Sequence, residues 1–253
     1  MSARPIFVVA GVGNSSGNGG ASARLFAKAG YNVALISREG ANIHKFAAEL
    51  KTGDTDAAAF PISAYNYKEV QTAFRAVRAH WPNSEIRVAL YNAGIGVWKP
   101  FLQTTEDEVD LITNTNVKAA FAFAHEAISA FKAQTIDEER GGKRGTLIFT
   151  GATASMRGNT TTAIFSATKF GLRSLSQSLN KEFGKENIHV AHVVIDGGIA
   201  TDATRARIGE EWAANRDRAI SPESLAKSHL YLANQDRSAW TWELDLRPAH
   251  EKW

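Results

Sequence analysis

The sequence predicts an α/β protein with a doubly wound, seven-stranded parallel sheet and helices on both faces, in three αβα layers. Seven short apolar runs alternate with amphipathic stretches along the 253-residue chain. This alternation favours parallel strands, because parallel neighbours need a crossover connection. The runs are almost continuously apolar, as expected for strands that helices cover on both sides. No linker or internal repeat interrupts the pattern, so residues 1–253 are expected to form a single domain.

Each expected element follows from the spacing of its apolar residues. Most expected strands are short and rich in β-branched residues, and they cover residues 6–10, 33–36, 57–60, 87–91, 146–150, 190–195 and 242–246. The stretches between them show helical spacing, at residues 21–29, 42–50, 68–80, 106–131, 163–183 and 222–233. The charged, Gly-rich stretch 137–145 is expected to be a surface loop.

Composition excludes several classes of protein. The 29 Lys and Arg residues exceed the 26 Asp and Glu residues by 3 and are scattered, so nucleic acid is not an expected partner. The chain has no cysteine and its 7 histidines are dispersed, which argues against disulfides, thiolate catalysis and a metal site. No run approaches the ~18 apolar residues of a membrane span, and residues 1–5 do not resemble a signal peptide. We therefore expect a cytoplasmic protein that does not bind membranes.

A glycine-rich segment follows the first strand and leads into the first helix. It consists of Gly13, Asn14, Ser15, Ser16, Gly17, Asn18 and Gly19. Glycines let the backbone approach a pyrophosphate, and a helix N-terminus offers N–H groups to an anion. The spacing G-x-x-x-G-x-G resembles the cofactor loop of the short-chain dehydrogenase/reductase (SDR) family. This resemblance implies a Rossmann-type fold and a nicotinamide dinucleotide cofactor.

The end of the second strand bears on the choice of cofactor. In dinucleotide-binding folds an acidic residue near this point binds the ribose hydroxyls of NAD, and a basic residue accommodates the 2′-phosphate of NADP. Here Ser37 stands in the place of the acid and Arg38 follows it. A guanidinium donates two parallel hydrogen bonds to a phosphate. The pair favours NADP(H) over NAD(H), although a solvated arginine at a strand end is an alternative interpretation.

Two further segments resemble the family's cofactor site. Residues 91–94 resemble its N-N-A-G segment beside the adenine ribose, which implies a role for Asn92, Ala93 and Gly94. Ser63 stands where the family often has an Asp that contacts the adenine amine. Residues 197–201 resemble its P-G-x-x-x-T segment, which holds the carboxamide and pyrophosphate and here contains Gly198, Ile199 and Thr201. The stretch 203–220 takes the place of the family's mobile substrate lid, near residues 200–220.

Two of the family's four catalytic residues are recognisable. Asn116 resembles the asparagine that kinks its helix and relays protons through water. Lys169 resembles the lysine that binds the nicotinamide ribose and lowers the pKa of the catalytic tyrosine. Phe165 occupies the position of that tyrosine, four residues before Lys169 and on the same helix face. Ala152 occupies the position of the catalytic serine. The chain therefore has F-x-x-x-K where the family has Y-x-x-x-K.

The missing tyrosine affects proton transfer. Reduction of a carbonyl by hydride leaves an alkoxide that needs a proton, and phenylalanine has no proton to give. General acid catalysis contributes ~100- to 10,000-fold, so an enzyme without it is slow rather than inactive. Thr153 is the best candidate among the hydroxyls near Ala152 to touch the substrate. A loop hydroxyl bonded to its own backbone is the alternative interpretation.

Three functions remain open on the sequence. The favoured one is an NADP(H)-dependent oxidoreductase acting on a small carbonyl or alcohol. The others are an NADP(H)-binding pseudoenzyme and a non-redox enzyme that reuses the pocket. Retention of the glycine loop, Asn116 and Lys169 favours the first, because Lys169 has little purpose without a nicotinamide ribose. Relatives pack the helices at 106–131 and 163–183 across a two-fold axis, so a homodimer or homotetramer is expected.

Overall fold

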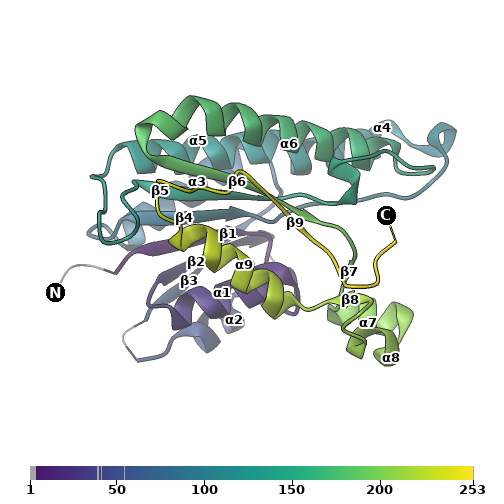
Figure 1. Cartoon of the computed structure of the whole chain (residues 1–253), viewed down its shortest axis with the longest axis horizontal. Coiled ribbons are helices and arrows are strands. Elements are labelled where there is room, and N and C mark those ends of the chain that lie inside the picture. Colours follow the sequence, from purple (N-terminus) through teal and green to yellow (C-terminus); the bar gives the residue numbers. More distant parts are fainter. Residues whose placement is uncertain (1–3, 39, 41, 54, 253) are drawn as a thin grey trace.

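Seven parallel strands form one central sheet in the spatial order β3-β2-β1-β4-β5-β6-β9 (Figure 1). The computed structural model describes residues 4–38, 40, 42–53 and 55–252, so the ends of the predicted domain, residues 1–3 and 253, lie outside the described residues. The order reverses between β1 and β4, which creates a topological switch point there. The predicted fold class is confirmed. The strands are β1 (Ile6–Ala10), β2 (Asn32–Arg38), β3 (Ala57–Ile62), β4 (Ile86–Tyr91), β5 (Gly145–Thr150), β6 (Ile188–Ile195) and β9 (Glu243–Leu246).

Helices cover both faces of this sheet (Figure 1). One face carries α1 (Asn18–Lys28), α2 (Ile43–Leu50) and α9 (Pro222–Asn234), and the other carries α3 (Tyr67–His80), α5 (Ala119–Lys132) and α6 (Ala163–Phe183). Alternate residues of β1 serve the two cores: Ile6 and Val8 face α3, α5 and α6, whereas Phe7 and Val9 face α1, α2 and α9. In the described part of the chain no helix is both long enough and apolar enough to cross a membrane.

The stretch 106–131, predicted as one helix, is interrupted. α4 (Glu106–Thr113) is followed by the π-helical turn η2 (Asn114–Lys118) and then by α5. The i→i+5 hydrogen bonds of a π turn widen the helix, and such turns are frequent at functional sites. Here the wide turn carries Asn116, whose side chain is bonded to the backbone of Ile95. The spacing of apolar residues did not distinguish a widened turn from a regular helix.

The stretch 203–220 forms a small layer beside the carboxyl edge of the sheet. Two short helices, α7 (Asp202–Ile208) and α8 (Glu210–Ala214), are enclosed by the paired strands β7 (Gly198–Ile199) and β8 (Ala219–Ile220). The indole of Trp212 packs inside this layer, and a Cβ on Gly198 would lie 2.6 Å from it. None of these four elements was predicted, because two-residue strands and helices of only 7 and 5 residues are too short to show periodicity. A role for this layer as a substrate lid remains a prediction.

Three histidines are buried as neutral groups. Burial lowers the pKa of His189, His192 and His229 to about 4. His192 on β6 bonds Glu243 on β9 at 3.0 Å, and Arg173 on α6 donates two further hydrogen bonds to that carboxylate, at 2.6 and 2.7 Å. Burial lowers the pKa of His192 by more than Glu243 raises it, because Arg173 already neutralises that carboxylate. His192 thus connects the edge strand to the sheet as a neutral group.

Candidate cofactor and active site

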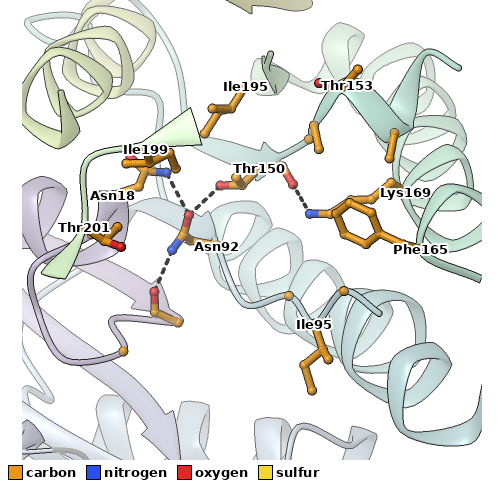
Figure 2. A pocket seen from close by; sticks show the side chains of 18 of the residues that line it. Asn18, Asn92, Ile95, Thr150, Thr153, Phe165, Lys169, Ile195, Ile199 and Thr201 are labelled. Atoms are coloured by element: carbon orange, nitrogen blue, oxygen red, sulfur yellow. Dashed lines mark hydrogen bonds between the residues drawn. The ribbon is translucent and has the colours of Figure 1, made fainter. Parts of the chain in front are cut away.

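A cavity of about 690 Å³ lies at the carboxyl ends of the central strands (Figure 2). Four of its walls come from segments at the ends of β1, β4, β5 and β6, within residues 11–19, 92–98, 150–154 and 195–201. The fifth comes from the start of α6 and the loop before it, within residues 159–169. Ligands of open α/β sheets bind at this edge, outside the switch point. The volume falls in the range of small-molecule sites, about 300–1,000 Å³.

The ends of β1 and β4 meet in a backbone contact that only glycine permits. Gly11 directly follows β1 with a φ of +93°, and a Cβ there would lie 2.5 Å from the backbone nitrogen of Ala93. A Cβ on Gly19, at the start of α1, would lie 2.2 Å from the carbonyl oxygen of Gly11. Gly13 has a φ of +54° but open space around it. The predicted motif therefore omitted Gly11, the glycine at the contact between β1 and β4, although its position directly after the first strand could have revealed it.

Most of the predicted glycine loop lines the cavity: Gly13, Asn14, Gly17, Asn18 and Gly19. Ser15 and Ser16 lie outside the lining. Arg24 donates to the Ser15 carbonyl at 2.7 Å, and the Ser16 hydroxyl accepts the backbone N–H of Asp202 at 3.0 Å. In this described loop, α1 begins without a side-chain cap and without an acidic residue in its first turn. Its first N–H groups are therefore available to an anion.

Asn92, at the end of β4, joins four segments through one amide (Figure 2). Its Nδ2 donates to the Gly11 carbonyl at 2.6 Å. Its Oδ1 accepts hydrogen bonds from Asn18 Nδ2 at 2.7 Å and from the Thr150 hydroxyl at 3.0 Å. The Oδ1 of Asn18 is buried and has no hydrogen-bond partner among the described residues. Thr150 belongs to the site. The sequence offered it as one of the hydroxyls close to Ala152, but it did not indicate the hydrogen bonds to Asn92 and Lys169.

Asn116 and Lys169 lie on the opposite side of the cavity from the glycine loop. Asn116 is buried and does not line the cavity: its amide accepts the N–H of Ile95 and donates to the Ile95 carbonyl and the Thr168 hydroxyl, each at 2.9 Å. Lys169 lines the cavity and donates to the Thr150 carbonyl at 2.8 Å. Burial lowers the pKa of the Lys169 ammonium to about 8. Asn116 thus positions the segment after β4, and Lys169 presents a buried cation to the cavity.

Aromatic rings form the wall beside Lys169. The Phe165 ring centroid lies 5.9 Å from Lys169 Nζ, which places both side chains on one face of α6 as predicted (Figure 2). Trp98 packs against Phe165 with ring centroids 5.2 Å apart, and it lies so close to Gly96 that a Cβ there would be 2.5 Å from the indole. Trp98 was not recognised in the sequence, because no motif marks it. Ile95, Ala152, Ala154 and Ile195 complete an apolar wall.

Thr153 lines the cavity with its hydroxyl already engaged. The hydroxyl donates to the buried carboxylate of Asp196, whose other oxygen lies 3.3 Å from the Arg247 guanidinium. Because its hydrogen points to Asp196, the Thr153 oxygen offers lone pairs to the cavity. It can accept a hydrogen bond from a substrate hydroxyl but does not donate one to an alkoxide in this arrangement. Contact of Thr153 with the substrate remains a prediction.

The residues that bear on the choice of cofactor lie beside the cavity. Ser37 is buried and Arg38 is exposed at the end of β2, in register with Pro61 and Ile62 of β3. Ser63 follows β3 and donates its N–H to Glu69 at 3.0 Å. All three lie at the carboxyl edge but outside the lining of the cavity. Of the other predicted cofactor-binding residues, Ala93 and Gly198 also lie outside the lining, whereas Asn92, Gly94, Ile199 and Thr201 form part of it.

Comparison with known proteins identifies the family. The model of the short chain dehydrogenase family matches residues 7–212. This chain belongs to the short-chain dehydrogenase family. The 3-oxoacyl-[acyl-carrier-protein] reductase MabA of Mycobacterium tuberculosis is 30% identical over 245 residues, covering 93% of this chain and 90% of the relative. Carbonyl reductase family member 4 of Xenopus laevis is 30% identical over 230 residues, covering 89% and 90%.

Solved structures share the fold of this short-chain dehydrogenase. A short-chain dehydrogenase from Rhodopseudomonas palustris superposes with a TM-score of 0.77 at 30% identity, covering 97% of this chain and all of that one (100%). An alcohol dehydrogenase from Thermococcus sibiricus, complexed with 5-hydroxy-NADP, has a TM-score of 0.82 at 19% identity and covers 99% of both chains. At that identity the second likeness establishes the fold alone.

The contact between Gly11 and Ala93 generates a prediction on stability. Alanine at Gly11 or at Gly13 is strained by the positive φ, but only at Gly11 does the new Cβ meet backbone. We expect Gly11→Ala to lower the free energy of unfolding by about 1–3 kcal/mol more than Gly13→Ala, as overpacking does. Urea unfolding followed by circular dichroism measures both. Equal midpoints for the two variants would contradict the close approach described here.

Proposed function

We propose that this short-chain dehydrogenase is a cytoplasmic NADP(H)-dependent oxidoreductase that acts on a small, uncharged carbonyl or alcohol. One observation carries the proposal: the buried ammonium of Lys169 lines the same cavity as the glycine loop. Burying a cation without an anionic partner is costly, and such groups are concentrated at functional sites. Its position across the cavity from α1 suits a nicotinamide ribose, with the pyrophosphate at the start of that helix. The reductase names of the two relatives described above support carbonyl chemistry.

The residues present fit a nicotinamide dinucleotide. Gly11 and Gly19 leave room for a close approach, and the uncapped start of α1 offers N–H groups to a pyrophosphate. The orphaned Asn18 Oδ1 can accept a hydrogen bond from a ligand hydroxyl. We assign Asn14, Asn18, Asn92, Ile199 and Thr201 to cofactor binding, together with Lys169. When bound, the cofactor supplies or accepts the hydride.

The wall beside Lys169 favours uncharged substrates. Apart from Lys169, the described lining consists of apolar, aromatic, amide and hydroxyl groups. Trp98 and Phe165 provide a hydrophobic surface on which an apolar substituent can pack. Phe165 also excludes water from the neighbourhood of the ammonium. We infer slow turnover with ordinary alcohols and ketones, since the tyrosine hydroxyl of the family is absent.

A second candidate function is cofactor binding without turnover. The observation that favours it is the pair Phe165 and Ala152, both of which line the cavity where the family has a proton-donating tyrosine and a serine. A regulator that senses NADP(H) needs the loop but no proton donor. A screen of carbonyl compounds for NADPH consumption, with parallel binding titrations, separates the two functions.

Cofactor preference follows from Ser37 and Arg38. We expect NADP(H) to bind at least ~10-fold tighter than NAD(H), a difference of about 1.4 kcal/mol. Arg38→Asp should abolish or reverse this preference by repelling the 2′-phosphate. Arg75→Asp, an exposed arginine on α3, serves as the charge-matched control and should leave the ratio unchanged. Calorimetric titration that shows equal or tighter binding of NAD(H) to the unaltered protein would refute the assignment.

Restoring a phenol should accelerate the reaction. We expect Phe165→Tyr, alone or with Ala152→Ser, to raise kcat for ketone reduction by ~10-fold or more if proton delivery limits the rate. NADPH absorbance measures turnover. Phe183→Tyr, at the end of the same helix, controls for the added hydroxyl and should change nothing. If the unaltered protein already reduces ketones rapidly and the tyrosine adds nothing, the conclusion that Phe165 costs the enzyme its proton donor would be wrong.

We also propose a homodimer or homotetramer. Leu111 on α4, Phe121 on α5 and Phe170 on α6 are exposed apolar side chains on the face that these helices turn away from the sheet. Exposed apolar residues in such numbers on one helical layer suit a second copy. Light scattering at micromolar concentration should give at least twice the chain mass. The double variant Phe121→Glu and Phe170→Glu should lower that mass, and a monomeric unaltered protein would contradict the proposal.

A further inference from the structure

Among the described residues that line the cavity, Lys169 is the only one with a titratable side chain. Its ammonium donates a single hydrogen bond, to the Thr150 carbonyl, which leaves two N–H groups for a ligand or water. A Cβ on Gly94 would lie 3.4 Å from Nζ, so the absence of a side chain at Gly94 keeps this side of the amine open. Among the described lining residues, Lys169 is therefore the only ionisable side chain that can donate a proton to a substrate or accept one from it.

The charged groups around α6 are engaged with one another. His192 on β6 is neutral and bonded to Glu243, which Arg173 neutralises. Asp196, after β6, binds Thr153 and pairs with Arg247. On the other elements against α6, Glu108 of α4 pairs with Lys99, Glu186 of η4 (Gly184–Glu186) pairs with Lys132, and Lys118 of η2 is exposed. β5 and η3 (Thr153–Ser155) present no ionisable side chain in the described chain. The positive charge of Lys169 is therefore not balanced by a carboxylate.

We propose that Lys169 is itself the proton donor in carbonyl reduction, in place of the absent tyrosine. This inference rests on the proposed function. An alkoxide that forms in an apolar cavity is strongly stabilised by a nearby ammonium without an anionic partner. Phe165 contributes an apolar ring 5.9 Å from Nζ, which offers the ammonium no hydrogen-bond acceptor and leaves its two remaining N–H groups to the cofactor and the substrate.

The step balances in atoms and charge. The substrate carbonyl carbon would gain a hydride and be reduced, while the NADPH that gives up this hydride would be oxidised to NADP⁺, and the π electron pair would move to the carbonyl oxygen. That oxygen then forms an O–H bond with a proton of Lys169, directly or across one water, as an N–H bond breaks. The neutral amine regains a proton from solvent before the next turnover. In alcohol oxidation the neutral amine of Lys169 accepts the hydroxyl proton instead.

A donor of this kind predicts a defined pH profile. Reduction needs the ammonium form, so its rate should be constant below the pKa of about 8 and should fall about tenfold per pH unit well above it. Lys169→Arg keeps the positive charge but does not titrate below pH 12. This variant should bind NADPH, reduce ketones ~100-fold more slowly and lose the fall in rate between pH 8 and 10.

Lys143→Arg provides the matched control. Lys143 is also buried with its pKa lowered to about 8, but it donates to Arg140 and Gln235 and lies at the amino end of β5. Its substitution should leave the rate and the profile unchanged. Lys169→Met tests whether loss of the amine alone abolishes reduction. Thermal melts of each variant and calorimetric NADPH binding exclude unfolding and loss of cofactor as causes.

Chemical labelling gives a readout that does not depend on turnover. Brief exposure to acetic anhydride between pH 6.5 and 10, followed by peptide mass spectrometry, should show Lys169 reactivity rising with a midpoint near pH 8 in the unliganded protein. Saturating NADPH should reduce this labelling. A Lys169 that remains unreactive up to pH 10 would overturn its assignment as an accessible, titrating group.

The outcomes separate the two proposals. Turnover with an unchanged rate and pH profile in Lys169→Arg overturns the assignment of the proton donor and leaves the oxidoreductase function standing. NADPH binding without turnover on any carbonyl overturns both. Slow turnover that falls above pH 8, and loses that fall only in the Lys169 variants, supports both.

Discussion

The backbone contact between Gly11 and Ala93 is the constraint on which the site depends. Because Gly11 has no Cβ, the ends of β1 and β4 approach closely enough for the Asn92 amide to reach Gly11, Asn18 and Thr150 at once. Thr150 then presents its carbonyl oxygen to Lys169 at 2.8 Å. Gly11 on the far side of the cavity therefore influences where the Lys169 ammonium lies, through the hydrogen bonds of Asn92 and Thr150.

The sheet was predictable because each central strand is a compact apolar run between polar residues, and β1 was predicted with its observed bounds. The glycine loop, Asn116 and Lys169 were recognisable because chemistry restricts their residue types. Trp98 and Thr150 were not, since their roles arise from contacts between segments far apart in the chain. A kink at Asn116 was implied by the family resemblance, but its form as a π turn was not, since the hydrogen bonds to Ile95 that accompany it join residues 21 positions apart.

With Phe165 in place of a tyrosine, the surroundings of Lys169 lose a polar hydroxyl and become more apolar. A phenol at this position would share hydrogen bonds with the substrate, whereas the phenyl ring packs against Trp98 and shields the amine from water. In such surroundings the effective dielectric constant is low, and a single charge acts more strongly than it does in water. Polar groups placed against this wall would lose hydration without gaining a partner.

The buried histidines give the fold a sensitivity to acid that is separate from the chemistry of the cavity. His189, His192 and His229 have folded-state pKa values of about 4, against about 6.5 in an unfolded chain. The unfolded state therefore binds more protons between these values, so stability is complete above pH 6.5 and declines as the pH falls towards 4, by about 3 kcal/mol per histidine. Lys169 titrates near pH 8, on the other side of neutrality. Between roughly pH 6.5 and 8 the buried histidines therefore cost the fold no stability, while Lys169 keeps its charge.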